Sequence, residues 1–259
     1  MLRARVLAGT LVLLVVLVLV DQFARGGGRT GTPDAPPAVP EGAVSRAALP
    51  ARSSAGTAPR AGFPDPAEVR AAITAAGDGV YLPAMFSETD STIRRWSDTL
   101  AGSLRIAFIR DTITGWTAED QEIARRSLGE WERLDIGVRF IEVFDTAGAQ
   151  IIVRWIPRFT FDRTGQADIA WDGSGRILHA SIQLALADQN GRPLPPDGLR
   201  AVALHEVGHA LGLPHSDRPE DLMYPTTRRP ELTPRDVATI QLLYHLPTLS
   251  IKWPAPSSP

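Results

Sequence analysis

The chain has 259 residues, a formal net charge of −2 at pH 7, 44% hydrophobic residues and no cysteine. The near-neutral charge excludes a general basic field for nucleic acid or anionic membranes. The lack of cysteine excludes disulfides, so a folded part must rely on its own core.

The first segment, residues 1–25, is typical of a targeting element. Arg3 and Arg5 precede an apolar run over residues 6–20, which would rise about 22 Å as a helix, short of a ~30 Å hydrocarbon core. This length favours a signal peptide. Because no clean cleavage site follows, an uncleaved signal anchor remains open. Both interpretations export the rest of the chain, which would be secreted or anchored, and any membrane contact would be through this segment.

Residues 26–64 are rich in Gly, Pro, Ala, Ser and Thr. Such a segment buries too little apolar surface to offset its ordering entropy, and we expect a disordered tether. Residues 65–94 open with a helical pattern in which Pro66 suits the first helical position. They are either an N-terminal extension or an inhibitory pro-segment.

Residues 95–248 are expected to form one domain, followed by a loose tail over residues 249–259. Thr117 starts one predicted helix, Asp197 caps a second that runs to about Leu211, and a third runs from Thr233 to Tyr244. Alternating apolar residues predict five short strands. They are expected at residues 104–109, 138–143, 150–156, 167–171 and 177–184.

The second of these helices carries the motif H-E-x-x-H-x-x-G-x-x-H, in which His205, His209 and His215 have the spacing of zinc ligands. Residues four apart share one helical face, so His205 and His209 can hold one ion. Gly212 can adopt a positive φ, end the helix and return the chain so that His215 completes the set. Three protein ligands leave a fourth position open, which is typical of a catalytic rather than a structural zinc.

Glu206 follows the first ligand directly, so its carboxylate can lie beside the metal without binding it. A metal lowers the pKa of its water toward ~7, and a neighbouring carboxylate can take the proton during attack. The motif therefore predicts Glu206 as general base.

A second motif, D-L-M-Y-P over residues 221–225, follows the histidines. Together the two motifs resemble the metzincin zinc endopeptidases, in which a Met-turn forms an apolar floor under the metal; Met223 matches it. Ser216 after the third histidine, and Pro225 where other branches have a metal-contacting tyrosine, make the resemblance closest to the matrixins.

The resemblance implies an α+β, zincin-like catalytic domain over residues 95–248: a twisted five-stranded mixed sheet, an active-site helix, a Met-turn and a C-terminal helix. It also implies a polypeptide substrate bound extended along an edge strand, for which residues 177–183 are our candidate. One catalytic zinc is the expected cofactor, and a monomer is the expected state.

Four features differ from the family pattern or stay open. Without cysteine, the latency device of many matrixins cannot exist, and with only His179 in place of a histidine set, a second, structural zinc is not expected. Loop carboxylates could bind calcium, but their spacing supports no known pattern; they are Asp162, Asp168, Asp172 and Asp188. Asp236 matches an aspartate that pairs with a new N-terminus in matrixins, or is a helix-start charge. His245, at the end of the last helix, is assigned no catalytic role.

The sequence thus predicts an exported zinc-dependent endopeptidase, with His205, His209 and His215 as ligands and Glu206 as base. Two alternatives remain. One is a zinc-bearing surface module without proteolytic activity, and the other is a protease restricted to processing its own chain.

Overall fold

The computed structural model describes residues 65–84, 92–109, 113–227 and 229–250, which belong to one compact unit, Thr57–Pro259. The predicted targeting element and tether, and residues 251–259 of the predicted tail, lie outside these ranges. None of the helices in the described part is long and apolar enough to cross a bilayer.

A five-stranded sheet forms the centre of the domain, with the order β3-β2-β4-β6-β5. β3, β2, β4 and β6 run parallel to one another, and β5 runs antiparallel to β6. The predicted mixed α+β fold is therefore confirmed, with strand ends shifted by a few residues. The strands are β2 Leu104–Ile109, β3 Phe140–Glu142, β4 Ile151–Ile156, β5 Gly165–Trp171 and β6 Ile177–Ala185.

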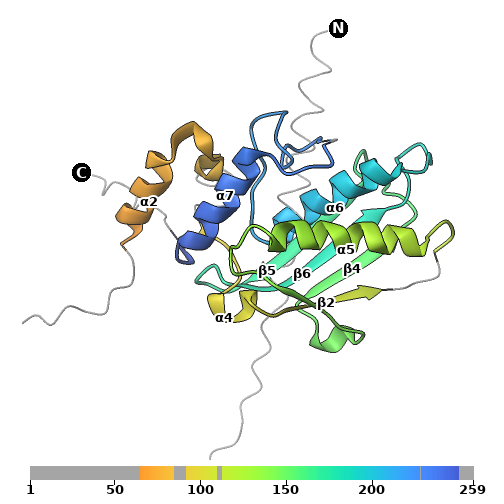
Figure 1. Cartoon of the computed structure of the whole chain (residues 1–259), viewed down its shortest axis with the longest axis horizontal. Coiled ribbons are helices and arrows are strands. Elements are labelled where there is room, and N and C mark those ends of the chain that lie inside the picture. The colour runs from red at the N-terminus through yellow and green to blue at the C-terminus, as the bar shows by residue number, and fades with distance from the viewer. Residues whose placement is uncertain (1–64, 85–91, 110–112, 228, 251–259) are drawn as a thin grey trace, which may run out of the picture. The chain divides into compact units, whose positions relative to one another are not determined.

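Two long helices, α5 (Ala118–Glu132) and α6 (Pro196–Ala210), lie side by side across one face of the sheet (Figure 1). Thr117 begins α5 with a capping box, as predicted. α6 begins differently from the prediction: its N-cap is Pro195 without a side-chain bond, and Asp197 lies in the first turn. Asp197 therefore complements the helix dipole instead of capping the helix.

The apolar core lies between these helices and the sheet. Alternate residues of β4 point into it, and Ile151, Val153 and Trp155 are buried as the period of a strand requires. Trp131 of α5 is fully buried and donates its indole N–H to the carbonyl of Leu204 on α6, at 3.2 Å. This contact joins the two helices beneath the sheet.

A smaller group of elements surrounds the C-terminal helix, α7 (Pro234–His245). α2 (Pro66–Ala75) begins at Asp65, which caps it, and Pro66 occupies its first position as predicted. The short helices η1 (Gly77–Gly79) and η2 (Leu82–Ala84) follow, and η1 packs against α7. Residues 65–84 therefore fold onto the C-terminal part of the domain.

The remaining elements of the described residues are short: α4 (Asp98–Ala101), η3 (Thr146–Gly148), β1 (Thr92–Ile93) and β7 (Leu249–Ser250). β7 pairs antiparallel with β1, so the expectation of a loose tail is wrong for these two residues. Backbone pairing with β1 supplies the hydrogen bonds that make a strand of them.

The choice of residues 177–183 as an edge strand is also wrong. These residues belong to β6, which pairs with β4 on one side and with β5 on the other. The edge of the sheet on this side is β5. Strand order depends on contacts between distant segments, which the apolar pattern of a single strand does not specify.

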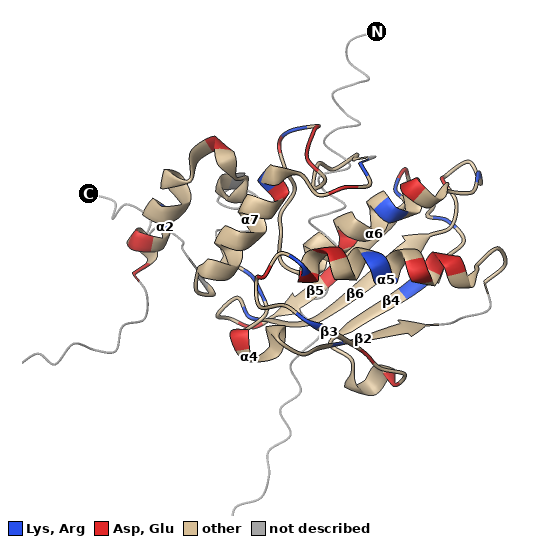
Figure 2. Cartoon of the chain, in the orientation of Figure 1, with Lys and Arg blue, Asp and Glu red and all other residues tan. Residues whose placement is uncertain are grey.

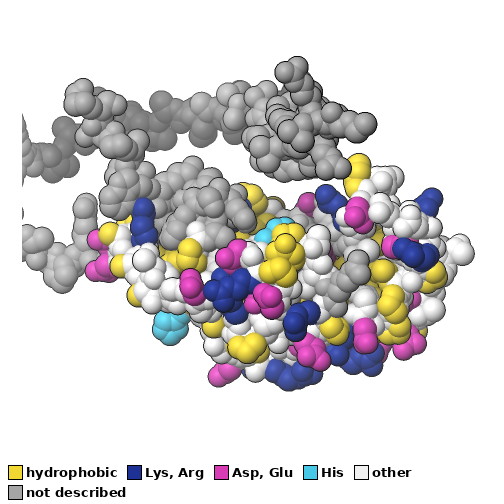
Figure 3. All heavy atoms as spheres, turned by 90° about the horizontal axis from the view of Figure 1, so that it is seen from above, with side chains coloured by type: hydrophobic (Ala, Val, Ile, Leu, Met, Phe, Trp, Pro, Cys, Tyr) yellow, Lys and Arg dark blue, Asp and Glu magenta, His cyan; other side chains and the backbone are white. Residues whose placement is uncertain are grey.

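Charged side chains of both signs are mixed over the domain. Acidic residues lie near both ends of α5, with basic residues near its middle (Figure 2). The face in Figure 3 likewise shows both signs interspersed with hydrophobic side chains.

Candidate metal centre

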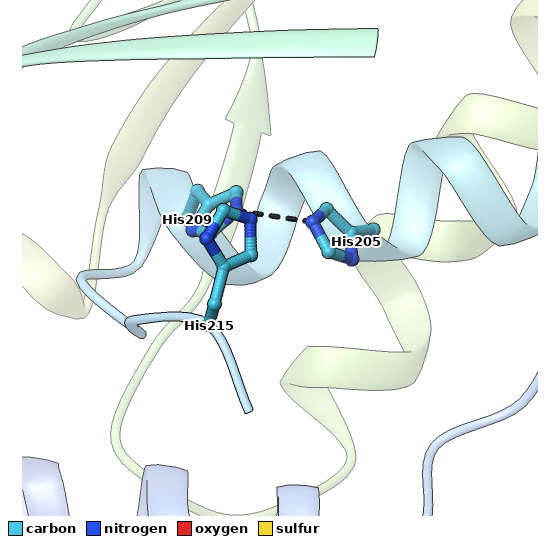
Figure 4. A group of neighbouring side chains, drawn as sticks. All are labelled: His205, His209 and His215. Atoms are coloured by element: carbon cyan, nitrogen blue, oxygen red, sulfur yellow. Dashed lines mark hydrogen bonds between the residues drawn. The ribbon is translucent and has the colours of Figure 1, made fainter. Parts of the chain in front are cut away.

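Three histidines from one helix and the loop that follows it converge on a single point. His205 and His209 project from the same face of α6, one turn apart, and His215 approaches them from the loop (Figure 4). His205 is buried and the other two are partly buried. Within the described ranges, these three side chains form the group that could share a metal ion. Their potential ligand atoms all lie within 4.8 Å of one another.

The turn that brings His215 back depends on Gly212. This residue has φ +104°, and the amides of Gly212 and Leu213 donate to the carbonyls of His209 and Gly208 at 2.9 and 3.0 Å. This bonding pattern is a Schellman motif, in which the residue after the C-cap leaves the right-handed region. A Cβ at Gly212 would also collide with the carbonyl oxygen of Arg94. The predicted role of Gly212 in the turn thus has a local structural basis.

The ring nitrogens are spaced as a small cation requires. The Nε2 atom of His209 lies 3.0 Å from that of His205 and 3.1 Å from that of His215. Tetrahedral zinc with Zn–N bonds of ~2.0–2.1 Å separates its ligand nitrogens by about 3.3 Å. The three residues therefore fit zinc in both ligand type and spacing.

In two of the histidines, a hydrogen bond to Nδ1 fixes which nitrogen faces the centre. The Nδ1 atoms of His205 and His209 lie 2.8 Å from the carbonyl oxygens of Leu222 and Leu213. Since a carbonyl oxygen only accepts, each Nδ1 must carry the hydrogen, and each neutral ring then points the lone pair of Nε2 inward. Lone pairs 3.0 Å apart repel, so the arrangement calls for a cation between them.

Burial keeps these rings neutral. It lowers the pKa of His205 and lowers that of His209 well below its usual range, with a further decrease for His209 from the two neighbouring rings. Burial and the charge of His205 lower the pKa of His215 to about 4. Neutral imidazole is the form that binds a metal.

Glu206 lies beside the histidines and is 6% exposed. Burial raises the pKa of its carboxyl to about 8, with Arg163 lowering it and Asp168 raising it by smaller amounts. Its side chain packs against the backbone of Gly165 at the start of β5, where a Cβ would overlap the carboxylate and stand 2.6 Å from Val202 Cγ1. Gly165 was not predicted as part of the site, because nothing local in the sequence indicates that this glycine faces α6.

Met223 packs against α6 and is fully buried. A Cβ at Gly208 would stand 2.5 Å from the Met223 sulfur and 3.1 Å from Trp131, so the glycine allows this close approach. The methionine therefore lies where the resemblance places the floor of the site.

Asp236 supports the Met-turn from α7. It is fully buried and forms a capping box with Thr233, and its carboxylate also accepts from the amides of Leu222 and Met223 at 2.9 and 3.3 Å. The helix-start interpretation is therefore correct, and the contact with the Met-turn was not predicted. The capping pattern T-P-R-D was the available signal for the first role.

The remaining candidates lie apart from the centre. His179 is on β6, paired across the sheet with Ala170, and His245 is exposed at the end of α7. Asp172 and Asp188 accept hydrogen bonds from their own turns and from Arg176 and Arg192. Asp168 accepts from Gln166.

The site combines three converging histidines, two from α6 and one from the loop after it, with an adjacent buried glutamate and a buried methionine. These features define a metallopeptidase-like site. Comparisons with known proteins agree. Residues 195–245 match the family model of the matrixins (Peptidase_M10). The chain is 30% identical to Metalloendoproteinase 4-MMP of Arabidopsis thaliana over 206 residues, 72% of this chain and 56% of that protein.

Two further relatives match over shorter stretches. Metalloendoproteinase 1-MMP of Arabidopsis thaliana is 32% identical over 142 residues, 49% of this chain and 39% of that protein. Macrophage metalloelastase of Rattus norvegicus is 44% identical over 63 residues, 22% of this chain and 14% of that protein. The chain thus spans about half the length of the first relative and less of the others. These matches support a resemblance to the matrixin metalloproteases, which the family model carries over residues 195–245.

Proposed function

We propose that this protein is an exported zinc-dependent endopeptidase, with His205, His209 and His215 as ligands of one catalytic zinc. The observation that carries the proposal is the convergence of three Nε2 atoms beside a buried glutamate, with two Nδ1 atoms engaged by backbone carbonyls. Zinc held there would supply Lewis acidity toward a peptide carbonyl and toward water.

Glu206 would carry the proton. Its carboxylate accepts the proton of the attacking water as the carbon–oxygen bond forms, and later gives it to the nitrogen of the leaving amine as the carbon–nitrogen bond breaks. The raised pKa of its carboxyl favours the second step, the return of the proton to the amine. The positive charge of a bound zinc would favour the carboxylate form that the first step needs. The buried position against Gly165 keeps the carboxylate on the side of the histidines that faces β5.

The substrate would bind as an extended strand along β5. Three observations support this: β5 is the terminal strand of the sheet, it packs against α6, and its first residue contacts Glu206. A peptide that pairs with an edge strand binds through its main-chain amides. A series of substrate peptides, each N-methylated at one backbone amide, tests this. Cleavage should be lost for methylation at every second residue, whose amide pairs with β5, and kept for the residues between. Equal tolerance at all positions would contradict β-pairing.

Export rests on the sequence of residues 1–25, with residues 26–64 as the tether of the enzyme. Cell fractionation and N-terminal sequencing of the mature protein test this proposal. A new N-terminus after residue 20 indicates a cleaved signal, and an intact one in the membrane fraction indicates an anchor.

Hydrolysis of casein by the full chain tests the peptidase. We compare the parent with Glu206→Gln at matched zinc content, each with and without a chelator. Cleavage that the chelator abolishes, and that falls at least a hundredfold in the variant, supports the assigned base. Parent-like activity in Glu206→Gln contradicts the mechanism, and bound zinc without cleavage of any substrate favours a binding module.

A further inference from the structure

Residues 65–84 lie against the part of the domain that supports the metal centre. We propose that this segment is a permanent component of that support, in which Tyr81 is a positioning residue that holds the Met-turn and, through it, the ring of His205. The inference rests on the proposed zinc function, and it goes beyond it by assigning a role to a segment whose sequence fits either an extension or a pro-segment.

Tyr81 is the anchor of the segment. Its side chain is 1% exposed, its hydroxyl donates to Asp236 Oδ1 at 3.0 Å, and its backbone amide donates to Thr239 Oγ1 at 3.3 Å. Burial, with the neighbouring charge of Asp236, raises the pKa of the Tyr81 hydroxyl well above its usual range. The hydroxyl therefore remains a donor at all working pH values. Val69, Ile73 and Leu82 of the same segment are also buried, which fastens it by apolar contact.

Asp236 passes this restraint to the Met-turn. Oδ1, which receives the Tyr81 hydroxyl, also accepts from the amide of Met223 at 3.3 Å, and Oδ2 accepts from the amide of Leu222 at 2.9 Å. Hydrogen bonds to a charged acceptor are stronger than neutral ones and fix the plane of the carboxylate. Thr233 also donates to Oδ2, through its amide at 2.9 Å and its hydroxyl at 2.6 Å. Without the tyrosine, Oδ2 would stay held and Oδ1 would keep only the longer bond to Met223, so the carboxylate could turn about Oδ2.

Leu222 completes the connection to the metal centre. Its amide is held by Asp236, and its carbonyl oxygen lies 2.8 Å from Nδ1 of His205. A partner on the far nitrogen of a ligating imidazole sets its tautomer and orientation. Tyr81, Asp236 and Leu222 are therefore three successive hydrogen-bonded links that end on one proposed ligand.

Arg235 forms a second connection between the segment and the loop after His215. Its guanidinium donates to the carbonyls of Asp78 and Val80 at 3.0 and 3.1 Å, and to the carboxylates of Asp217 and Asp221 at 2.8 and 2.6 Å. It also lies over the Tyr81 ring, 5.4 Å from its centroid. These bonds join residues on both sides of the Met-turn to residues 78–80.

Tyr81→Phe in the full chain tests the inference, because it removes the hydroxyl and keeps the ring. The matched control is Ser127→Ala, which removes another fully buried hydroxyl, on α5, whose bond goes to the carbonyl of Ile123. Three quantities are measured for each: amide hydrogen exchange of Leu222 and Met223 without zinc, the rate of zinc release to a chelator, and the rate of casein cleavage.

We expect amide exchange in Tyr81→Phe to be about tenfold faster, most clearly at Met223, because a bond to a charged acceptor is lost. Zinc release should be about threefold to tenfold faster, since partners behind a ligand typically change affinity by ~10–100-fold and Tyr81 acts through two intermediates. Cleavage should fall, and Ser127→Ala should match the parent in exchange and zinc release.

Parent-like exchange and zinc release in Tyr81→Phe would overturn the inference, and so would equal changes in Ser127→Ala, which indicate general destabilisation. An increase in cleavage in Tyr81→Phe would identify an inhibitory pro-segment instead. If the parent binds no zinc, the proposed function fails, whereas amide exchange still decides whether Tyr81 holds the Met-turn.

Discussion

Gly165 offers the sharpest test of how Glu206 is positioned. In Gly165→Ala, the new methyl group would lie 2.6 Å from Val202 Cγ1 and 2.7 Å from Glu206 Cγ, and closer still to the Glu206 carboxylate. Carbon atoms in contact stand about 3.5–4.0 Å apart, so the glutamate must move by roughly 1 Å. A displacement of this size in a catalytic group can lower the rate by ~10²-fold. Overpacking should also cost about 1–3 kcal/mol of stability.

The assay is kcat/KM for casein-derived peptides at measured zinc content, beside a thermal unfolding curve. Gly173→Ala is the matched control, because a methyl group there would meet no atom within 4 Å and the φ of Gly173 is not positive. We expect full zinc content in both variants and a large loss of kcat/KM in Gly165→Ala alone. A kcat/KM within about threefold of the parent in Gly165→Ala would refute the inferred packing of Glu206 against β5.

Two further changes test the turn and the acid stability of the fold. Gly212→Ala places a side chain at a residue with φ +104° and against the carbonyl of Arg94. The variant should therefore lose more than about 1 kcal/mol of stability, measured by calorimetry. It should also bind zinc more weakly through His215, measured by zinc titration. The backbone amide of Arg192, and then its side chain, lower the pKa of Asp188. A lowered folded-state pKa contributes stability above the unfolded value of ~3.9 that is lost as pH falls through the folded value. The melting temperature of Asp188→Asn should therefore fall less steeply below about pH 4 than that of the parent, and parallel curves would contradict this.

The convergence of the three histidines was predictable because its geometry is local. His205 and His209 share a helical face by their spacing alone, and Gly212 marks the turn that returns His215. No long-range contact is needed to bring these residues together. The same holds for the capping boxes at Thr117 and Thr233, where each cap and its partner are three residues apart.

The edge of the sheet was not predictable in this way. β5 and β6 both alternate, and residues 177–183 were predicted as the edge, although β6 lies between two strands. The two strands differ in burial: β6 buries the apolar residues Ile177, Ala180, Ile182 and Leu184, whereas β5 has no buried residue. The signal available in the sequence was the polar composition of β5. A strand that carries polar and charged side chains, as β5 does on one face with Gln166 and Asp168, favours an edge position.

The support of the Met-turn shows why a correct local prediction can be incomplete. Asp236 starts α7, as one of the two interpretations held, but the same carboxylate also holds Leu222, Met223 and Tyr81, the last from 155 residues away in the chain. Replacing Asp236 would disturb the helix start, the Met-turn and the N-terminal segment at once, so its effect could not be divided among them. Tyr81 contributes one hydroxyl to one oxygen of that carboxylate, and its removal leaves the capping box in place. The role of residues 65–84 is therefore decided at Tyr81 rather than at Asp236.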